Sequence, residues 1–185
     1  MERQELSSKF VLGSKLPEFC LPSVAHGSID SKELNGKAIL IVFMCNHCPY
    51  VVGSIKMLNE TIRKYLDQGL QAVGINSNDP EKYPQDSFEN MKQFAQTHNL
   101  CFPYCFDETQ GVAKAFDAAC TPELYLFDSN KCLIYHGGIN DYPDNPDLVT
   151  KNFLDEVCRA YFSGENIDSS WSLKYRPRGC SIKWK

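Results

Sequence analysis

The sequence lacks the features of several large classes of protein. Residues 1–19 carry charges in every short window, so they offer neither the apolar core of a secretory signal nor a membrane-spanning segment of about 20 residues. No run of five like charges occurs, and the net charge of -4 comes from 23 acidic and 19 basic residues spread along the chain. These absences argue against a membrane protein and against a nucleic-acid-binding surface. We therefore expect a cytoplasmic protein.

Internal repeats and low-complexity linkers are also missing, and 43% of the 185 residues are apolar. A chain of this length and composition can bury one substantial core, so we predict a single domain, 1–185. The core is expected over about 10–163. The polar C-terminal tail, 164–185, contains glycine and proline and is expected to be irregular. We expect a monomer or a homodimer.

Cysteine, in contrast, is abundant, with nine residues. In an oxidising compartment these would indicate structural disulfides, but without an export signal most of them are expected to be free thiols. Because nine is an odd number, at least one cysteine cannot be paired within the chain. The question is therefore which cysteines are reactive and which are small buried apolar residues.

The first half of the chain predicts a βαβ unit. Residues 38–44 are continuously apolar and rich in β-branched and aromatic types, as in a strand covered on both faces. Pro49 opens a segment with apolar residues at helical spacing, and Gly69 marks its end. Residues 70–75 are a second buried strand, and the crossover between parallel strands should be right-handed. Residues 38–44 then form the central strand.

The second half predicts two further helices, a β-hairpin and a last helix. The hairpin joins 124–127 to 132–136 through a polar four-residue turn and adds an antiparallel edge to the sheet. The helices are expected around 88–95, 112–119 and 153–161. This order of elements predicts an α/β sandwich, with a central mixed β-sheet flanked by helices on both faces.

Cys45 and Cys48 are the candidate catalytic residues, because they lie where the central strand ends and the helix begins. A helix N-terminus presents free N–H groups and a partial positive charge, so a thiol there ionises more readily and becomes a nucleophile. The spacing of two intervening residues lets one sulfur resolve the mixed disulfide that the other forms with a substrate. Asn46, His47 and Pro49 shape this site, and a protonated His47 would further favour the thiolate.

A pair of cysteines at this spacing can also be half of a zinc site. A structural zinc site usually needs a second ligand pair, and the nearest candidate is Cys101 with Cys105. That pair flanks a segment that we expect to be extended, and it has no histidine partner at zinc-finger spacing. We expect no metal and no other cofactor.

A strand followed by Cys45-x-x-Cys48 and a helix, and then Thr121-Pro122 ahead of a hairpin, resembles the thioredoxin superfamily. The resemblance implies a thioredoxin-like three-layer sandwich. It also implies that Pro122 is cis and faces the dithiol, and that the backbone of Thr121 can pair with an extended substrate segment. Site-shaping roles for Thr121 and Pro122 follow from this resemblance.

Several short phrases narrow the resemblance to a peroxiredoxin-like group of bacterial thioredoxin-family proteins, nearly from end to end. The opening, 13–22, is similar to the start of peroxiredoxins and of related alkyl-hydroperoxide-reductase and thiol-antioxidant proteins. The other phrases are Phe43–Val51, Ile75–Asp79, Phe102–Tyr104, Asp107–Gln110, Ala119–Pro122 and Gly179–Lys185.

Against peroxiredoxins, the register places Cys48 at the peroxidatic position. The threonine that peroxiredoxins carry three residues earlier is replaced here by Cys45. Peroxiredoxins also use an arginine on a neighbouring strand, and the matching region here offers Pro122. The resemblance thus supports dithiol exchange better than peroxide reduction.

Two further cysteines have candidate roles. Cys120 precedes Thr121-Pro122, so it is expected near the dithiol, either as a small buried packing residue or as a third redox thiol. Cys180 lies in the phrase that ends the chain. It could fold back onto the domain as a resolving thiol, or be a docked or exposed residue.

Three hypotheses follow. The first is a thiol-disulfide oxidoreductase with an antioxidant or redox role, in which Cys45 attacks and Cys48 resolves. Its partners would be protein or small-molecule disulfides and thiols. The second is a thiol peroxidase with Cys48 peroxidatic and Cys45 resolving, and the third is a non-enzymatic zinc-binding or interaction domain.

Overall fold

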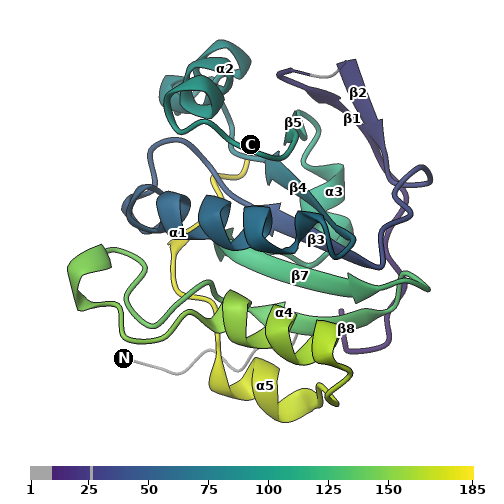
Figure 1. Cartoon of the computed structure of the whole chain (residues 1–185). Coiled ribbons are helices and arrows are strands. Elements are labelled where there is room, and N and C mark those ends of the chain that lie inside the picture. Colours follow the sequence, from purple (N-terminus) through teal and green to yellow (C-terminus); the bar gives the residue numbers. More distant parts are fainter. Residues whose placement is uncertain (1–9, 26) are drawn as a thin grey trace.

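The computed structural model describes residues 10–25 and 27–185, and within these ranges a mixed sheet of seven strands forms the centre of the fold (Figure 1). The strands run in the order β2-β1-β5-β4-β3-β7-β8, and a separate two-stranded sheet pairs β6 with β9. Their bounds are β1 Cys20–Ser23, β2 Gly27–Asp30, β3 Ala38–Phe43, β4 Leu70–Asn76, β5 Tyr104–Phe106, β6 Cys120–Thr121, β7 Glu123–Asp128, β8 Leu133–Gly137 and β9 Cys180–Ser181.

Helices cover both faces of the large sheet, which gives three layers (Figure 1). Side chains of α1, α2 and α4 belong to the apolar core on one face, and α3 contributes to the core on the other. The helices are α1 Pro49–Leu66, α2 Phe88–Thr97, α3 Gly111–Ala115, α4 Phe153–Ser163 and α5 Ser169–Lys174, with 3₁₀ turns at Pro84–Asp86 and Pro146–Leu148.

Strand β3 is an interior strand of the sheet, between β4 and β7, and all six of its side chains are buried. It pairs in parallel with β4, from Ala38 opposite Leu70 to Phe43 opposite Ile75. On its other side it pairs antiparallel with β7, and β8 completes the hairpin at the sheet edge. The predicted central strand, βαβ unit, edge hairpin and three-layer mixed-sheet architecture are confirmed.

Helix α1 is held against the sheet by one apolar stripe. Val51, Ile55, Leu58 and Ile62 recur at three- and four-residue intervals, and all four are buried in the core. The helix carries no acidic residue in its first turn, and its last turn has two basic residues, which suits the helix dipole at that end. This packing fixes the position of the helix N-terminus at the end of β3.

The prediction of an irregular tail over 164–185 is wrong, because the structure places α5 and β9 there. The Tyr175 ring stacks on Phe153 with 4.2 Å between ring centroids, and Ile182 is buried in the core under α3. The tail is held by contacts with distant parts of the chain. Its own sequence therefore shows no helical or strand period from which α5 and β9 could be predicted. The short strands β1, β2 and β5 also had no clear local signal.

In the described part of the chain, none of the helices has the length and apolarity needed to span a bilayer.

Candidate active site

The two candidate cysteines lie at the junction of β3 and α1. Cys48 is the N-cap residue of α1, with extended backbone angles (φ -69°, ψ 121°), and Pro49 takes the first helical position. No side chain caps this helix end. Pro49 has no N–H, and the N–H groups of Val51 and Val52 donate to the Cys48 carbonyl at 3.0 and 2.9 Å, so the helix end acts on Cys48 through the positive end of its dipole.

Thr121 brings the second element of the site to the dithiol. Its hydroxyl lies 3.4 Å from the Cys45 sulfur, and its carbonyl accepts a hydrogen bond of 3.1 Å from the Cys48 thiol. The peptide bond between Thr121 and Pro122 is cis, as predicted. Both sulfurs are buried, with exposed fractions of 1% for Cys45 and 0% for Cys48.

The surroundings of the two sulfurs make their acidities different. Hydrogen bonding from the Cys45 thiol, with further donors from Cys180, lowers the pKa of Cys48 despite its burial. The same hydrogen bond, burial and the negative charge of Asp86 raise the pKa of Cys45. These influences favour the thiolate at Cys48 and are opposed by the Thr121 carbonyl, which accepts from the Cys48 thiol; the sequence pattern favoured Cys45 instead.

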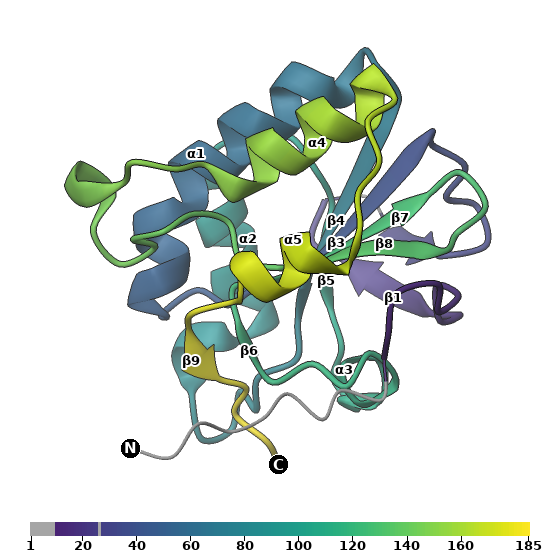
Figure 2. The ribbon, with the colours of Figure 1, turned by 90° about the horizontal axis from the view of Figure 1, so that it is seen from below.

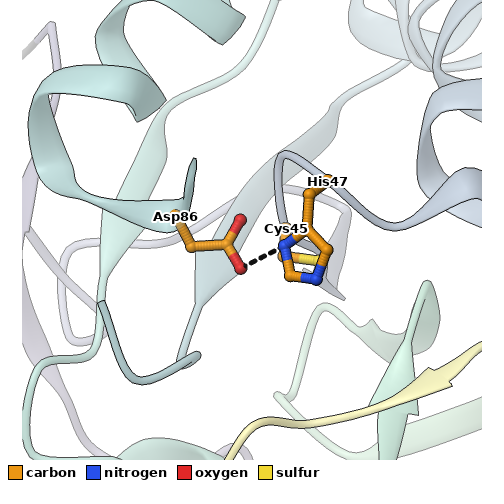
Figure 3. Close-up of side chains that lie close together, drawn as sticks. All are labelled: Cys45, His47 and Asp86. Carbon is orange, nitrogen blue, oxygen red and sulfur yellow. Dashed lines mark ion pairs between the residues drawn. The ribbon is translucent and has the colours of Figure 1, made fainter. Parts of the chain in front are cut away.

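Asp86 is a site residue that the sequence reasoning missed. Its carboxylate is fully buried and accepts hydrogen bonds from the Asn46 backbone N–H at 2.8 Å and from Asn78 Nδ2 at 2.7 Å. Its Oδ2 also lies 2.7 Å from His47 Nδ1 (Figure 3). Asp86 belongs to a polar loop between β4 and α2, where an acidic residue ordinarily indicates only solvent exposure. Nothing in the local sequence sets it apart.

Asn46 and His47 connect the dithiol loop to this carboxylate. Asn46 also donates from Nδ2 to the Gln85 carbonyl at 2.8 Å, and its Oδ1 accepts from the Tyr104 hydroxyl at 3.0 Å. The His47 ring stacks on Tyr83, with ring centroids 5.6 Å apart and an interplanar angle of 2°. The loop is therefore held in place by contacts to residues 83–86.

Cys45, His47 and Asp86 have potential ligand atoms that all lie within 4.8 Å of one another (Figure 3). Among the residues that the structure describes, this is the one group of three or more such side chains close enough to hold a metal ion. Sulfur, imidazole and carboxylate donors suit zinc. Cys101 and Cys105, which the sequence offered as a second ligand pair, do not belong to the group.

Cys120 and Cys180 both come near the dithiol. Burial and the Glu123 carboxylate raise the pKa of Cys120, and its backbone N–H donates to Glu123 Oε2 at 3.0 Å. This environment keeps the Cys120 thiol protonated, which agrees with a packing role. Cys180 pairs with Thr121 through β9 and β6, so the tail is brought to the site.

We expect Asp86→Asn to lower the free energy of unfolding by about 1–3 kcal/mol, because a buried hydrogen-bonded carboxylate is replaced by a group that cannot accept all three contacts. Urea unfolding measures this loss. Glu89→Gln is the matched control, since the Glu89 carboxylate is exposed on the first turn of α2 and pairs there with Lys92. Equal stability of the two variants would show that the buried carboxylate network contributes nothing.

The fold and the site together define a thioredoxin-like protein with a dithiol at the N-terminus of the first helix after the central strand. Residues 12–136 match the model of the AhpC/TSA family. The chain belongs to this family.

Two solved structures are similar over nearly the whole chain. An uncharacterised conserved protein from Geobacillus kaustophilus is 39% identical with a TM-score of 0.85, and the match covers 96% of this chain and 95% of that one. A hypothetical protein from Sinorhizobium meliloti 1021 is 34% identical with a TM-score of 0.86, with 95% of each chain covered. Among curated proteins, the thiol-disulfide oxidoreductase ResA of Halalkalibacterium halodurans is 23% identical over 131 residues, 70% of each chain.

Proposed function

We propose that the protein is a thiol-disulfide oxidoreductase that uses the Cys45 and Cys48 dithiol. The observation that carries this proposal is the pair of sulfurs beside Thr121 at the N-terminus of α1, with Cys48 as the N-cap residue. The activity named for the ResA relative supports the same reaction class. The substrate would be a disulfide of a protein or of a small molecule.

In the first step, the Cys48 thiolate attacks one sulfur of the substrate disulfide. A mixed disulfide forms between Cys48 and that sulfur, and the other substrate sulfur leaves as a thiolate and takes up a proton. We assign this role to Cys48 because it is the N-cap residue of α1, where the helix dipole and the neighbouring hydrogen-bond donors favour a thiolate. The proposal thus exchanges the roles that the sequence pattern indicated for the two cysteines.

In the second step, Cys45 loses its proton and attacks the Cys48 sulfur of the mixed disulfide. The Cys45–Cys48 disulfide forms, and the second substrate thiol is released. Asp86 and His47 lie within 4.8 Å of the Cys45 sulfur and provide the proton acceptor for this step. Two electrons pass from the dithiol to the substrate, and the reverse sequence would oxidise a substrate dithiol.

A single-turnover comparison of two oxidants tests this function. We expect glutathione disulfide to oxidise Cys45 and Cys48 with release of two glutathione thiols per chain, whereas hydrogen peroxide should oxidise Cys48 no faster than it oxidises free cysteine. Stopped-flow kinetics and mass spectrometry of the alkylated protein measure both. Oxidation by peroxide far above that of free cysteine would instead support the thiol peroxidase with Cys48 peroxidatic.

The zinc-binding alternative has its own test. Stoichiometric zinc in the purified protein, absent when the Cys45, His47 or Asp86 side chain is replaced, would favour a metal site over a redox dithiol.

A cytoplasmic location agrees with the nine free cysteines, and it stays a prediction.

A further inference from the structure

Cys180 is placed at the dithiol by a backbone pairing. Strand β9 runs antiparallel to β6, with Cys180 opposite Thr121 and Ser181 opposite Cys120 (Figure 2). Thr121 is the residue whose hydroxyl and carbonyl contact Cys45 and Cys48. The tail therefore occupies the backbone edge of Thr121, next to both sulfurs.

The tail also influences the acidity of Cys48. Hydrogen bonding from the backbone and the side chain of Cys180 contributes to lowering the pKa of Cys48. Burial raises the pKa of Cys180 to about 11, so this third sulfur stays a thiol while Cys48 is a thiolate.

Several contacts hold the tail in this register. A Cβ on Gly179 would lie 2.0 Å from the Thr121 carbonyl oxygen, so no side chain fits there. The Ile182 N–H donates to the Ala119 carbonyl at 3.0 Å, and the Lys183 N–H donates to Asn78 Oδ1 at 2.8 Å.

A buried glutamine adds to these contacts. Gln110 Nε2 donates to the Lys183 carbonyl at 2.9 Å, and Gln110 Oε1 accepts from the Lys185 N–H at 3.0 Å. Three of the phrases that carried the resemblance, those with Asn78, Gln110 and Cys180, therefore meet where the tail docks. Residues of all three phrases thus hold the tail in position.

We propose that Cys180 is a third redox thiol of this site, which β9 holds opposite Thr121 and next to Cys48 so that a Cys48–Cys180 disulfide forms during turnover. This proposal rests on the proposed oxidoreductase function and assigns it a second resolving sulfur.

The Cys48–Cys180 disulfide forms by exchange with an existing disulfide, so it needs no further oxidant. In the oxidised protein, Cys180 loses its proton and attacks the Cys48 sulfur of the Cys45–Cys48 disulfide. The Cys48–Cys180 bond forms, the Cys45–Cys48 bond breaks, and Cys45 leaves with the electron pair and takes up a proton. In a mixed disulfide, the same attack on Cys48 releases the substrate thiol.

The Cys45→Ser variant of the full chain isolates the third thiol, because Cys45 can then no longer resolve. We expect the reduced variant, mixed with glutathione disulfide, to release two glutathione thiols per chain. Trypsin should then yield a disulfide-linked pair of peptides, 38–56 and 179–183, since cleavage follows lysine and arginine. In the matched Cys45→Ser/Cys180→Ser variant, Cys48 should retain glutathione and only one thiol should be released.

The outcomes separate this proposal from the proposed function. Persistent glutathione on Cys48 in Cys45→Ser, or a link from Cys48 to Cys120, overturns the role of Cys180 and leaves the oxidoreductase intact. If Cys48 takes up no glutathione in either variant, the proposed function itself fails.

A second variant tests the docking of the tail and keeps both sulfurs of the proposed link, Cys48 and Cys180. We expect Cys45→Ser/Gly179→Ala to form the Cys48–Cys180 link about tenfold more slowly, because the added methyl group shifts the tail toward undocked states. Uptake of glutathione by Cys48 should not be slowed. An unchanged rate of linkage would show that docking of β9 does not present Cys180.

Discussion

Replacement of Cys48 by serine is expected to reduce disulfide reduction to the background rate, a loss of at least about a hundredfold, because the chain loses its one stabilised thiolate nucleophile. Insulin reduction with dithiothreitol as the electron donor measures the loss. Cys20→Ser is the matched control, since Cys20 is exposed and lies in β1, three strands away from β3 in the sheet. Its rate should equal that of the unchanged chain.

The assignment of roles within the pair is tested in chains that also carry Cys180→Ser. Cys45→Ser should then trap a mixed disulfide on Cys48, and Cys48→Ser should trap none on Cys45. Peptide mapping distinguishes the two. A mixed disulfide trapped on Cys45 would restore the roles that the sequence pattern indicated, and would refute the thiolate at Cys48.

The second large effect concerns pH. The folded protein lowers the pKa of Cys48, so its thiolate should persist as the pH falls below the ordinary thiol value of 9.0 and should be lost only when the pH falls through the lowered pKa. The thiolate's ultraviolet absorbance, titrated with acid, measures this without a reagent that must enter the buried site. The thiolate absorbance that the unchanged chain keeps at low pH should be absent from Cys48→Ser.

Two substitutions at Cys45 identify the cause of this shift. The hydrogen bond from Cys45 is the largest influence that lowers the pKa of Cys48. Cys45→Ser keeps a hydroxyl donor, so the acidic titration should be retained. Cys45→Ala removes the donor, so the titration should move toward higher pH. Identical titrations of the two variants would place the cause elsewhere, in Cys180 or in the helix N-terminus.

The pKa values of Cys45 and Cys48 show which features of the site the local sequence predicts and which it does not. The spacing of the cysteines, the apolar strand before them and Pro49 after them together predict a dithiol at a helix N-terminus, because each is a short-range pattern. The same pattern suggested Cys45 as the thiolate. That choice depends on Asp86 beside Cys45 and on Cys180 beside Cys48, and neither proximity is visible in the residues between 44 and 49.

The tail illustrates the same limit for the fold. The helical period of α1 and the continuous apolar run of β3 are properties of neighbouring residues, so the sequence predicts both elements. Strand β9 has two residues, and its backbone partners in β6 lie far away in the chain. A segment this short has no period of its own, which is why an irregular tail was expected over 164–185.

The sequence by itself determined the sandwich of a mixed sheet between helices and the place of Cys45 and Cys48 at the end of the central strand, and its family resemblance implied the cis bond before Pro122. Only the tertiary structure brought Asp86 and Cys180 to the two sulfurs, where they influence the pKa of each. The physical reason is range: periodicity and helix ends are set by adjacent residues, whereas the pKa of a buried thiol is set by charges and donors brought close in space. Asn46 and Asp86 are separated by 40 residues, and Asn78 and Lys183 by 105.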